Sequence, residues 1–208
     1  MLTSASDHPL YRDTIQQLSL PLKSLDSITA FDFVSKSDLV PEHPQDPSRL
    51  FVLPASAYTR LHQTSGSRGF PMPVYDTPQD WDWWMHCWQH VLDAADVTSS
   101  DVAMMAFSFG PFIGFWSAND ALVQRGALVV AGGGLSSLGR LQMIDRYECT
   151  VLCCTPTYAL HLANVARENR LDLDAGSVER IIVAGEPGGS VASTRAAIEA
   201  AWGAKLID

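Results

Sequence analysis

The second half of the sequence alternates short, continuously apolar runs with longer segments of mixed polarity. The first four runs are VAMMAFS (102–108), ALVVAGG (127–133), TVLCCTP (150–156) and RIIVAGEP (180–187). A fifth run begins with AKLID at position 204. Runs that stay apolar at nearly every position are typical of strands buried on both faces of a parallel sheet. We therefore expect an α/β domain with a mostly parallel sheet and helices on both faces.

The segments between these runs have the composition and spacing of helices. They are FWSANDALVQRG (115–126), LSSLGRLQMIDRYE (135–148), TYALHLANVARENR (157–170) and VASTRAAIEAAWG (191–203). A further helix is expected to begin upstream, because Thr77 can cap it and Pro78 suits its first position. Trp81, Trp84 and Trp88 follow at helical spacing. This spacing predicts one aromatic stripe that packs in the core.

The first part of the chain is less regular. Residues 1–50 are expected to form an irregular lead-in with one or two helices, before an α/β part that spans 51–208. The stretch HQTSGSRGFPMPV (62–74) lies between two short strand-like runs, and we expect it to join the first two strands of the sheet. Because Gly and Ser are common in tight turns, one interpretation is a hairpin turn. The other is an anion cradle of backbone and hydroxyl donors.

Composition and charge narrow the class of protein. The chain has 208 residues, of which 47% are hydrophobic, and a net charge of −9, so we expect one globular domain. An acidic chain lacks the basic surface that neutralises phosphates, so nucleic acid is not an expected partner. The start has no basic or apolar leader pattern, and no run is long enough to span a bilayer. We therefore predict a cytoplasmic protein with no membrane association.

Two glycine-rich motifs do not fit nucleotide-binding fingerprints. GLSSLGRL (134–141) has the glycine spacing of a P-loop, but Arg140 and Leu141 stand where Lys and Ser or Thr are needed. Gly132–Gly134 is followed by Ser137 in place of the third glycine of a dinucleotide-binding turn. These departures exclude a Walker-type NTPase and leave a Rossmann dehydrogenase without support.

Metal and thiol chemistry receive little support from the sequence. His86 and His90 have a zinc-binding spacing, but Cys87 replaces the glutamate of that motif, so packing or solvation is favoured. Cys153 and Cys154 lie in an apolar run, where free cysteine normally behaves as a small buried hydrophobe. No metal site is therefore predicted.

Five motifs together resemble the phenylacetate-CoA ligase branch of the adenylate-forming enzymes. The stretch TSGSRGFP (64–71) resembles the phosphate-binding signature of those enzymes. The other four motifs follow the order of that branch and are SKSDLV (35–40), AFSFGPFIG (106–114), CTPTYALHLA (154–163) and AGEPGG (184–189). The resemblance covers most of residues 35–208 and implies the large domain of an acid-CoA ligase, present in part.

The resemblance implies a role for three groups of residues in a reaction that joins an aromatic carboxylic acid to ATP and then to coenzyme A. The acid would be an aryl or arylacetic acid. The implied phosphate-binding residues are Thr64, Ser65, Gly66, Ser67, Arg68 and Gly69. The implied adenine-binding residues are Ala184, Gly185, Glu186 and Pro187. The implied acyl pocket consists of Phe107, Phe109, Gly110 and Phe112.

The sequence also departs from the family pattern. Arg68 replaces a second threonine and Met72 replaces a lysine; Arg68 would contact phosphate or point to solvent. The resemblance implies that the catalytic residues and the Mg²⁺ ligand lie downstream of Asp208, and that a homodimer can form. Two function classes stay open: an AMP-forming ligase, for this acid, another acid or a deazaflavin cofactor, and a non-catalytic nucleotide-binding or interaction module.

Overall fold

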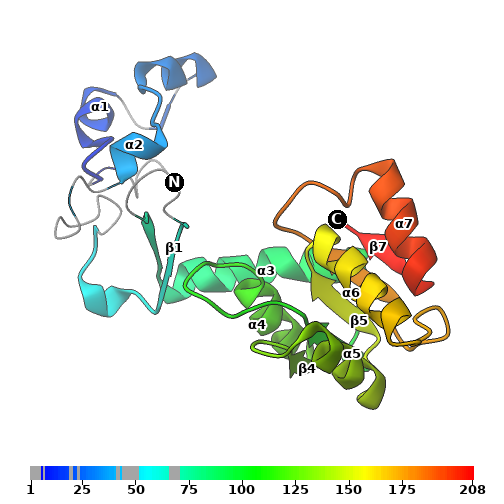
Figure 1. The fold of residues 1–208 in the computed structure, drawn as a ribbon. Coiled ribbons are helices and arrows are strands. Elements are labelled where there is room, and N and C mark those ends of the chain that lie inside the picture. Colours follow the sequence, from blue (N-terminus) through cyan, green and yellow to red (C-terminus); the bar gives the residue numbers. More distant parts are fainter. Residues whose placement is uncertain are drawn as a thin grey trace. The chain divides into compact units, whose positions relative to one another are not determined.

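The computed structural model divides the chain into two compact units, Met1–Gln79 and Asp80–Asp208. It describes residues 6, 8–18, 21, 22, 24–40, 43, 52–65 and 71–208. The division falls later in the chain than the boundary expected at residue 50. The Gly- and Ser-rich stretch therefore belongs to the first unit (Figure 1).

The first unit contains short elements only. Its α-helices are α1 (Arg12–Gln17) and α2 (Lys36–Leu39), and its 3₁₀ helices are η2 (Leu25–Ala30) and η3 (Ala55–Ala57). In α2, Ser35 and Asp38 form a capping box, in which each side chain satisfies a backbone N–H of the first turn. Residues 12–39 thus contain two short α-helices and one 3₁₀ helix.

The first two strands form a separate hairpin, contrary to the prediction that they open the main sheet. Strand β1 (Arg60–Gln63) pairs antiparallel with β2 (Pro73–Asp76) in a two-stranded sheet of their own. The connection between them is too short for a parallel crossover, which needs a dozen or more residues. Each strand also has one buried residue, His62 or Asp76, so neither has the apolar character of a central strand.

The second unit is built on a five-stranded parallel sheet, which confirms the predicted fold class. The strand order is β4–β3–β5–β6–β7, and every neighbouring pair is parallel. The strands are β3 (Val102–Met105), β4 (Leu128–Ala131), β5 (Val151–Cys154), β6 (Arg180–Val183) and β7 (Lys205–Ile207). All five lie within the apolar runs from which they were predicted.

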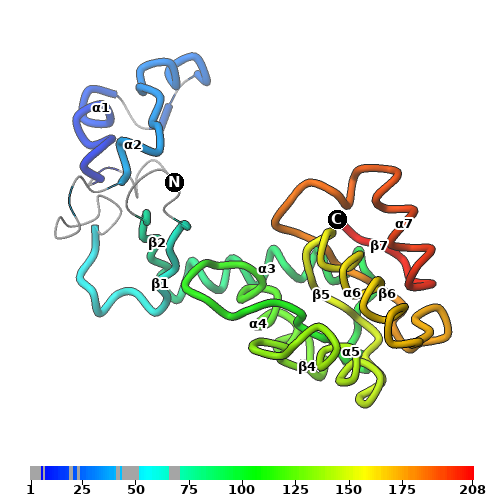
Figure 2. Tube along the Cα trace, in the orientation of Figure 1, coloured from blue at the N-terminus to red at the C-terminus, as the bar shows by residue number. Residues whose placement is uncertain are grey.

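Five helices connect and cover these strands, as Figure 2 allows the reader to follow along the chain. They are α3 (Pro78–Ala94), α4 (Trp116–Arg125), α5 (Ser137–Arg146), α6 (Pro156–Glu168) and α7 (Ala192–Trp202). Helix α3 begins at Pro78, as predicted. Helices α4 and α7 end at Gly126 and Gly203, whose φ angles of 89° and 62° place them in the left-handed region that stops a helix.

Successive residues of the central strands enter two different cores, so helices cover both faces of the sheet. In β5, Leu152 and Cys154 pack with residues of α5, α6 and α7. Val151 and Cys153 pack on the opposite face with residues of α3 and α4. This alternation is the period of two expected of a strand that is buried on both sides.

The predicted tryptophan stripe packs in the second of these cores. Trp81 is buried, and Trp84 and Trp88 are partly buried against the same cluster. Two of the indoles also donate hydrogen bonds to α4, from Trp81 Nε1 to Asp120 Oδ2 at 3.0 Å and from Trp88 Nε1 to the Ser117 hydroxyl at 2.7 Å. The prediction that this stripe is core is confirmed.

The amino-terminal edge of the sheet is held by a buried ion pair. Asp101 accepts hydrogen bonds from the Thr98 N–H at 2.7 Å, from the Thr150 hydroxyl at 2.7 Å and from Arg180 Nη2 at 2.5 Å. Burial raises the pKa of Asp101, but these hydrogen bonds and the Arg180 charge outweigh burial, so the pKa lies below its ordinary value. The network connects β3, β5 and β6.

Candidate functional site

The candidate site lies at the carboxyl-terminal edge of the parallel sheet. In sheets of this kind, ligands bind in the loops that follow the strands. Here AFSFGPFIG and AGEPGG lie in the loops after β3 and β6, and CTPTYALHLA runs from the end of β5 into the first turns of α6. Three of the five resembled motifs therefore meet at one edge.

Glu186 joins the loops that follow β5 and β6. Its carboxylate accepts hydrogen bonds from the N–H of Thr157 at 2.8 Å and from the hydroxyl of the same residue. Thr155 caps α6, and Pro156 occupies its first turn, so Glu186 places a negative charge at the start of this helix, where the helix dipole favours it. These hydrogen bonds hold the pKa of Glu186 below its ordinary value.

Close backbone packing explains the glycines of this loop. Gly185 has a φ of 95°, which a residue with a side chain rarely adopts. A Cβ at Gly188 would come within 2.7 Å of the Pro156 ring, and one at Gly189 would come within 2.5 Å of Asp208. The loops after β5 and β6 and the end of β7 therefore form one tightly packed wall that includes the predicted adenine-binding residues Ala184–Pro187.

The predicted acyl-pocket residues lie in an aromatic cluster after β3. The rings of Phe107 and Phe109 have centroids 4.4 Å apart, and Phe109 packs edge-on against Trp116 at 4.5 Å. Trp116 Nε1 also donates a 3.0 Å hydrogen bond to the Gly110 carbonyl. Phe112 is 48% exposed, and a Cβ at Gly110 would come within 3.1 Å of its ring. The structure thus brings all four predicted residues into one loop.

The predicted phosphate-binding stretch falls between β1 and β2, which pair as an antiparallel hairpin, and its phosphate-binding role stays a prediction. Of its residues, Gly66, Ser67, Arg68 and Gly69 lie outside the described residues. The Thr64 N–H donates to the Met72 carbonyl at 3.0 Å, and the Thr64 hydroxyl accepts from the Met72 N–H at 3.0 Å. Because that hydroxyl acts as an acceptor there, its hydrogen is left to donate to a ligand.

Arg140 is a residue of this edge that the sequence analysis missed. It lies on α5, is only 6% exposed and donates from Nε to the Gly132 carbonyl at 2.8 Å and from Nη1 to the Ala106 carbonyl at 3.3 Å. Its guanidinium carbon lies 5.0 Å from the centre of the Tyr158 ring. In the sequence, this residue is visible as one arginine within the apolar face of LGRLQMI. In the sequence analysis, that arginine served only to exclude a P-loop.

Cysteine and histidine side chains add no reactive centre at this edge. Burial raises the pKa of Cys149 to about 11 and that of Cys153 to about 12, and it also raises the pKa of Cys154. His86 and His90 contact each other edge-on, with ring centres 5.1 Å apart. Within the described part of the chain, no three His, Cys, Asp or Glu residues form a metal-binding group.

Among the described residues, no helix has the length and apolar character needed to cross a membrane.

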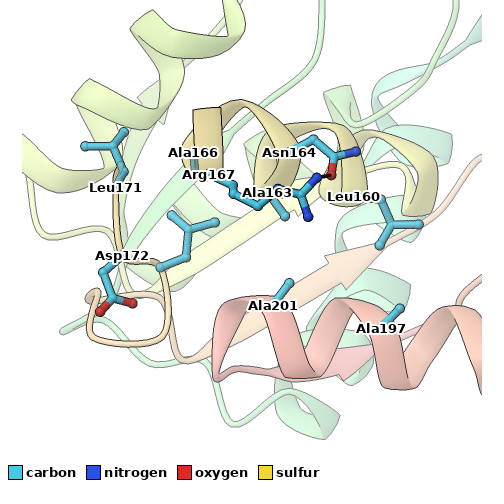
Figure 3. A pocket seen from close by; sticks show the side chains of 10 residues that line it. Leu160, Ala163, Asn164, Ala166, Arg167, Leu171, Asp172, Ala197 and Ala201 are labelled. Atoms are coloured by element: carbon cyan, nitrogen blue, oxygen red, sulfur yellow. Dashed lines mark hydrogen bonds between the residues drawn. The ribbon is translucent and has the colours of Figure 1, made fainter. Parts of the chain in front are cut away.

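A groove of about 510 Å³ lies between α6 and α7, and its lining includes Leu160 and Ala163 from the end of the CTPTYALHLA motif. Figure 3 shows Leu160 and Ala163 of α6 facing Ala197 and Ala201 of α7. Arg167 borders the groove and donates a 2.8 Å hydrogen bond to Asn164. None of the predicted site residues lines this groove.

Comparisons with known proteins agree with this geometry. No family model matches the chain. The phenylacetate-coenzyme A ligase of Aromatoleum evansii is 28% identical over 187 residues, which cover 90% of this chain and 41% of that protein. The corresponding ligase of Pseudomonas putida is 26% identical and is matched over 37% of its length. The chain therefore spans less than half the length of these relatives.

A solved structure shares the fold over almost the whole chain. The 2-hydroxyisobutyryl-CoA ligase in complex with 2-HIB-AMP and CoA superposes with a TM-score of 0.87 and 28% identity, covering 98% of this chain and 45% of that one. The same ligase in an open conformation gives a TM-score of 0.86. The chain is thus similar to phenylacetate-CoA ligases in sequence and to an adenylate-forming CoA ligase in fold, and it matches less than half the length of each.

Proposed function

We propose that the chain is the nucleotide- and acid-binding part of an AMP-forming acid-CoA ligase. The observation that supports this proposal most is the meeting of three resembled motifs at one edge of the sheet, where Glu186 and Thr157 tie two of them together. The relatives named as phenylacetate-CoA ligases and the neighbour that holds an acyl-AMP and CoA point to the same class of reaction.

In this proposal, the β1–β2 hairpin holds the phosphates of ATP. The free hydroxyl hydrogen of Thr64 and the hydroxyl of Ser65 can donate to phosphate oxygens without a large side chain in the way. Arg68 would add a charged, two-pronged contact. The Mg²⁺ that accompanies ATP would take its protein ligand downstream of Asp208, as the family resemblance implies.

The wall after β5 and β6 would contact adenine. Gly185 lets the backbone turn without a side chain, and Glu186 fixes that turn to the start of α6. A flat base can then lie against the backbone of Ala184–Pro187. ATP binding would supply the leaving pyrophosphate, and the residues here would orient the nucleotide.

The aromatic cluster after β3 would bind the acid. Phe107 and Phe109 present ring faces and edges that suit a phenyl group, and Gly110 lets the Phe112 ring pack closely against the backbone. An aryl or arylacetic acid therefore fits this cluster. The 2-hydroxyisobutyryl-CoA ligase neighbour makes a small hydroxy acid the alternative to test.

The experiment is a calorimetric titration of ATP, phenylacetate and 2-hydroxyisobutyrate into the 208-residue chain, together with a pyrophosphate-release assay. Saturable binding of ATP and of one acid is expected. Replacing Arg68 by alanine should weaken ATP binding by about tenfold, the loss expected for one charged hydrogen-bonding group. The matched control is Arg12→Ala, which removes an exposed charge from α1 of the same unit.

Each result separates the two function classes. An unchanged ATP affinity in Arg68→Ala removes Arg68 from the site. Binding without pyrophosphate release favours a nucleotide-binding module for this chain. Absence of ATP binding in the unsubstituted chain contradicts the proposed function.

A further inference from the structure

Arg140 carries a buried positive charge that no carboxylate among the described residues neutralises. The side chain lies on α5 and is 6% exposed. Within the part of the chain that the structure describes, the ion pairs involve other residues, and none includes Arg140. Buried arginines are rare unless they are paired, so this position requires an explanation.

The contacts of Arg140 satisfy part of its hydrogen-bonding capacity and none of its charge. Two carbonyls accept from Nε and Nη1, and the Tyr158 ring lies beside the guanidinium. Carbonyl dipoles and an aromatic ring attract a cation weakly compared with an anion. The remaining nitrogen, Nη2, makes no hydrogen bond with the described residues. A planar guanidinium with one free nitrogen can still bind an oxyanion.

The two carbonyls place this charge at the ligand-binding edge. Ala106 directly follows β3, and Gly132 directly follows β4. Ala106 also precedes Phe107 of the aromatic cluster, and a Cβ at Gly133 would lie 3.2 Å from the Phe109 ring. Both loops thus accept hydrogen bonds from the Arg140 guanidinium, and the loop after β3 also contains the proposed acyl pocket.

Polar side chains connect Arg140 to solvent. The Tyr158 and Ser137 hydroxyls are 3.0 Å apart, and the Ser137 hydroxyl is 3.0 Å from His161 Nε2. The Tyr158 and His161 rings stack with centres 5.6 Å apart. Arg140 is buried, Tyr158 and Ser137 are half-buried, and His161 is exposed. The four side chains form a polar path from the surface to the guanidinium.

The Glu186 carboxylate, an acidic group of this edge, is already engaged by Thr157. Arg140 and Glu186 both act on the charge of Cys154, with opposite signs. The Glu186 carboxylate, however, accepts from Thr157 and forms no ion pair with Arg140. Glu186 therefore leaves the guanidinium without a counter-ion.

We propose that Arg140, Tyr158, Ser137 and His161 form a binding site for an oxyanion, a carboxylate or a phosphate, at the carboxyl-terminal edge of the sheet. This inference goes beyond the proposed function, because the site would bind an anion whether or not the chain forms an adenylate. The anion can come from a carboxylic acid or from a phosphate-bearing ligand, and the two sources differ in their response to small probes.

The test titrates sodium phenylacetate and sodium phosphate separately into the 208-residue chain, without nucleotide and at constant ionic strength set with sodium chloride. Saturable binding of at least one probe is expected, and the probe that binds identifies the source. Arg140→Met should weaken that binding by roughly 10- to 100-fold, as expected for loss of a buried charged hydrogen-bonding partner. The matched control is Arg146→Met, which removes an exposed charge from the last turn of the same helix.

Circular dichroism would show whether Arg140→Met folds. If it does not fold, a second variant still tests the proposal. Tyr158→Phe combined with His161→Ala removes a hydroxyl and an exposed ring, and it should weaken binding by about three- to tenfold. The proposal is overturned if neither probe binds the unsubstituted chain, if folded Arg140→Met binds like Arg146→Met, or if the double variant binds with unchanged affinity. Failure of ATP binding in a separate titration would contradict the proposed function and leave this result intact.

Discussion

Each edge of the parallel sheet contains an arginine, half-buried Arg180 at one and buried Arg140 at the other, and the two differ in their charged partners. At the amino-terminal edge, Arg180 pairs with Asp101, which also accepts from Thr98 and Thr150. At the carboxyl-terminal edge, Arg140 meets two carbonyls and a ring. The charge of Arg180 is neutralised by an ion pair, whereas no carboxylate among the described residues pairs with Arg140.

This difference suggests that one edge of the sheet mainly stabilises the fold and that the other edge is suited to bind a ligand. A closed network of charge and hydrogen bonds stabilises the fold but leaves nothing for a ligand to contact. An open cation contributes less to the fold and can attract an anion. The comparison predicts that substitutions at the amino-terminal edge change mainly stability, and that those at the carboxyl-terminal edge also change ligand affinity.

The largest effect is expected from Asp101→Asn. This change keeps the shape of the side chain but leaves half-buried Arg180 without its principal anion. Loss of one partner of a buried ion pair should lower the free energy of unfolding by about 3 kcal/mol. Urea denaturation followed by circular dichroism measures this loss.

The control for this prediction is Asp93→Asn. Asp93 pairs with Arg125 at 2.7 Å, but its side chain is 65% exposed, so the change should lower the free energy of unfolding by less than about 1 kcal/mol. Equal losses in the two variants would contradict the special role of the Asp101 network.

The second prediction concerns pH. The pKa of Asp101 is lower in the folded protein than its ordinary value of 3.8, so the carboxylate stabilises the fold fully above that value. This contribution is lost as the pH falls below 3.8 toward the folded-state pKa. The free energy of unfolding should therefore fall more steeply below pH 4 in the unsubstituted chain than in Asp101→Asn. Parallel profiles would show that Asp101 does not titrate differently in the two states.

The third prediction compares two glycines at opposite edges. A Cβ at Gly188 would come within 2.7 Å of the Pro156 ring, and one at Gly176 within 3.0 Å of the Leu173 carbonyl. Gly188→Ala should lower the free energy of unfolding by roughly 1–3 kcal/mol through overpacking, and should also weaken ATP binding. Gly176→Ala should affect stability alone. Calorimetric titration of both folded variants checks the distinction, and equal ATP affinities would remove Gly188 from the nucleotide wall.

The smallest effect is expected from Glu186→Gln. Glutamine keeps an acceptor for Thr157 but loses the charge at the start of α6, so the adenine loop should be less firmly held. ATP affinity should fall by about three- to tenfold, with little change in the unfolding midpoint because the side chain is not deeply buried. Glu168→Gln, at the other end of the same helix, is the control. An equal response of both variants would contradict the positioning role.

Much of the second unit could be predicted from the sequence, because its strands are apolar at nearly every position and its helices lie between them. The sheet to which the first two strands belong could not be assigned correctly, because they were expected to open the main sheet and instead form one of their own. The residue buried in β1 is His62 and the one buried in β2 is Asp76, and both are polar. A pattern of alternating burial over four residues does not show with which strand each of them pairs. Pairing depends on the length of the connection and on tertiary contacts.

The candidate site shows a similar limit. A family resemblance led to Glu186 and Phe109, and the structure places both at the same edge of the sheet. Arg140 could not be found in this way, because its importance depends on burial and on the absence of a nearby anion, neither of which is visible in a sequence. The sequence does show that an arginine interrupts an apolar helix face, but many arginines in such positions extend their guanidinium groups into solvent.

The burial of three of the four cysteines makes the chain suitable for selective labelling. Cys149, Cys153 and Cys154 are buried, and burial holds them as thiols, whereas Cys87 on α3 is half-buried. Only a thiolate reacts readily with a maleimide. A fluorescent dye should therefore attach at Cys87 alone, which would give a spectroscopic reporter on α3 without any engineered substitution.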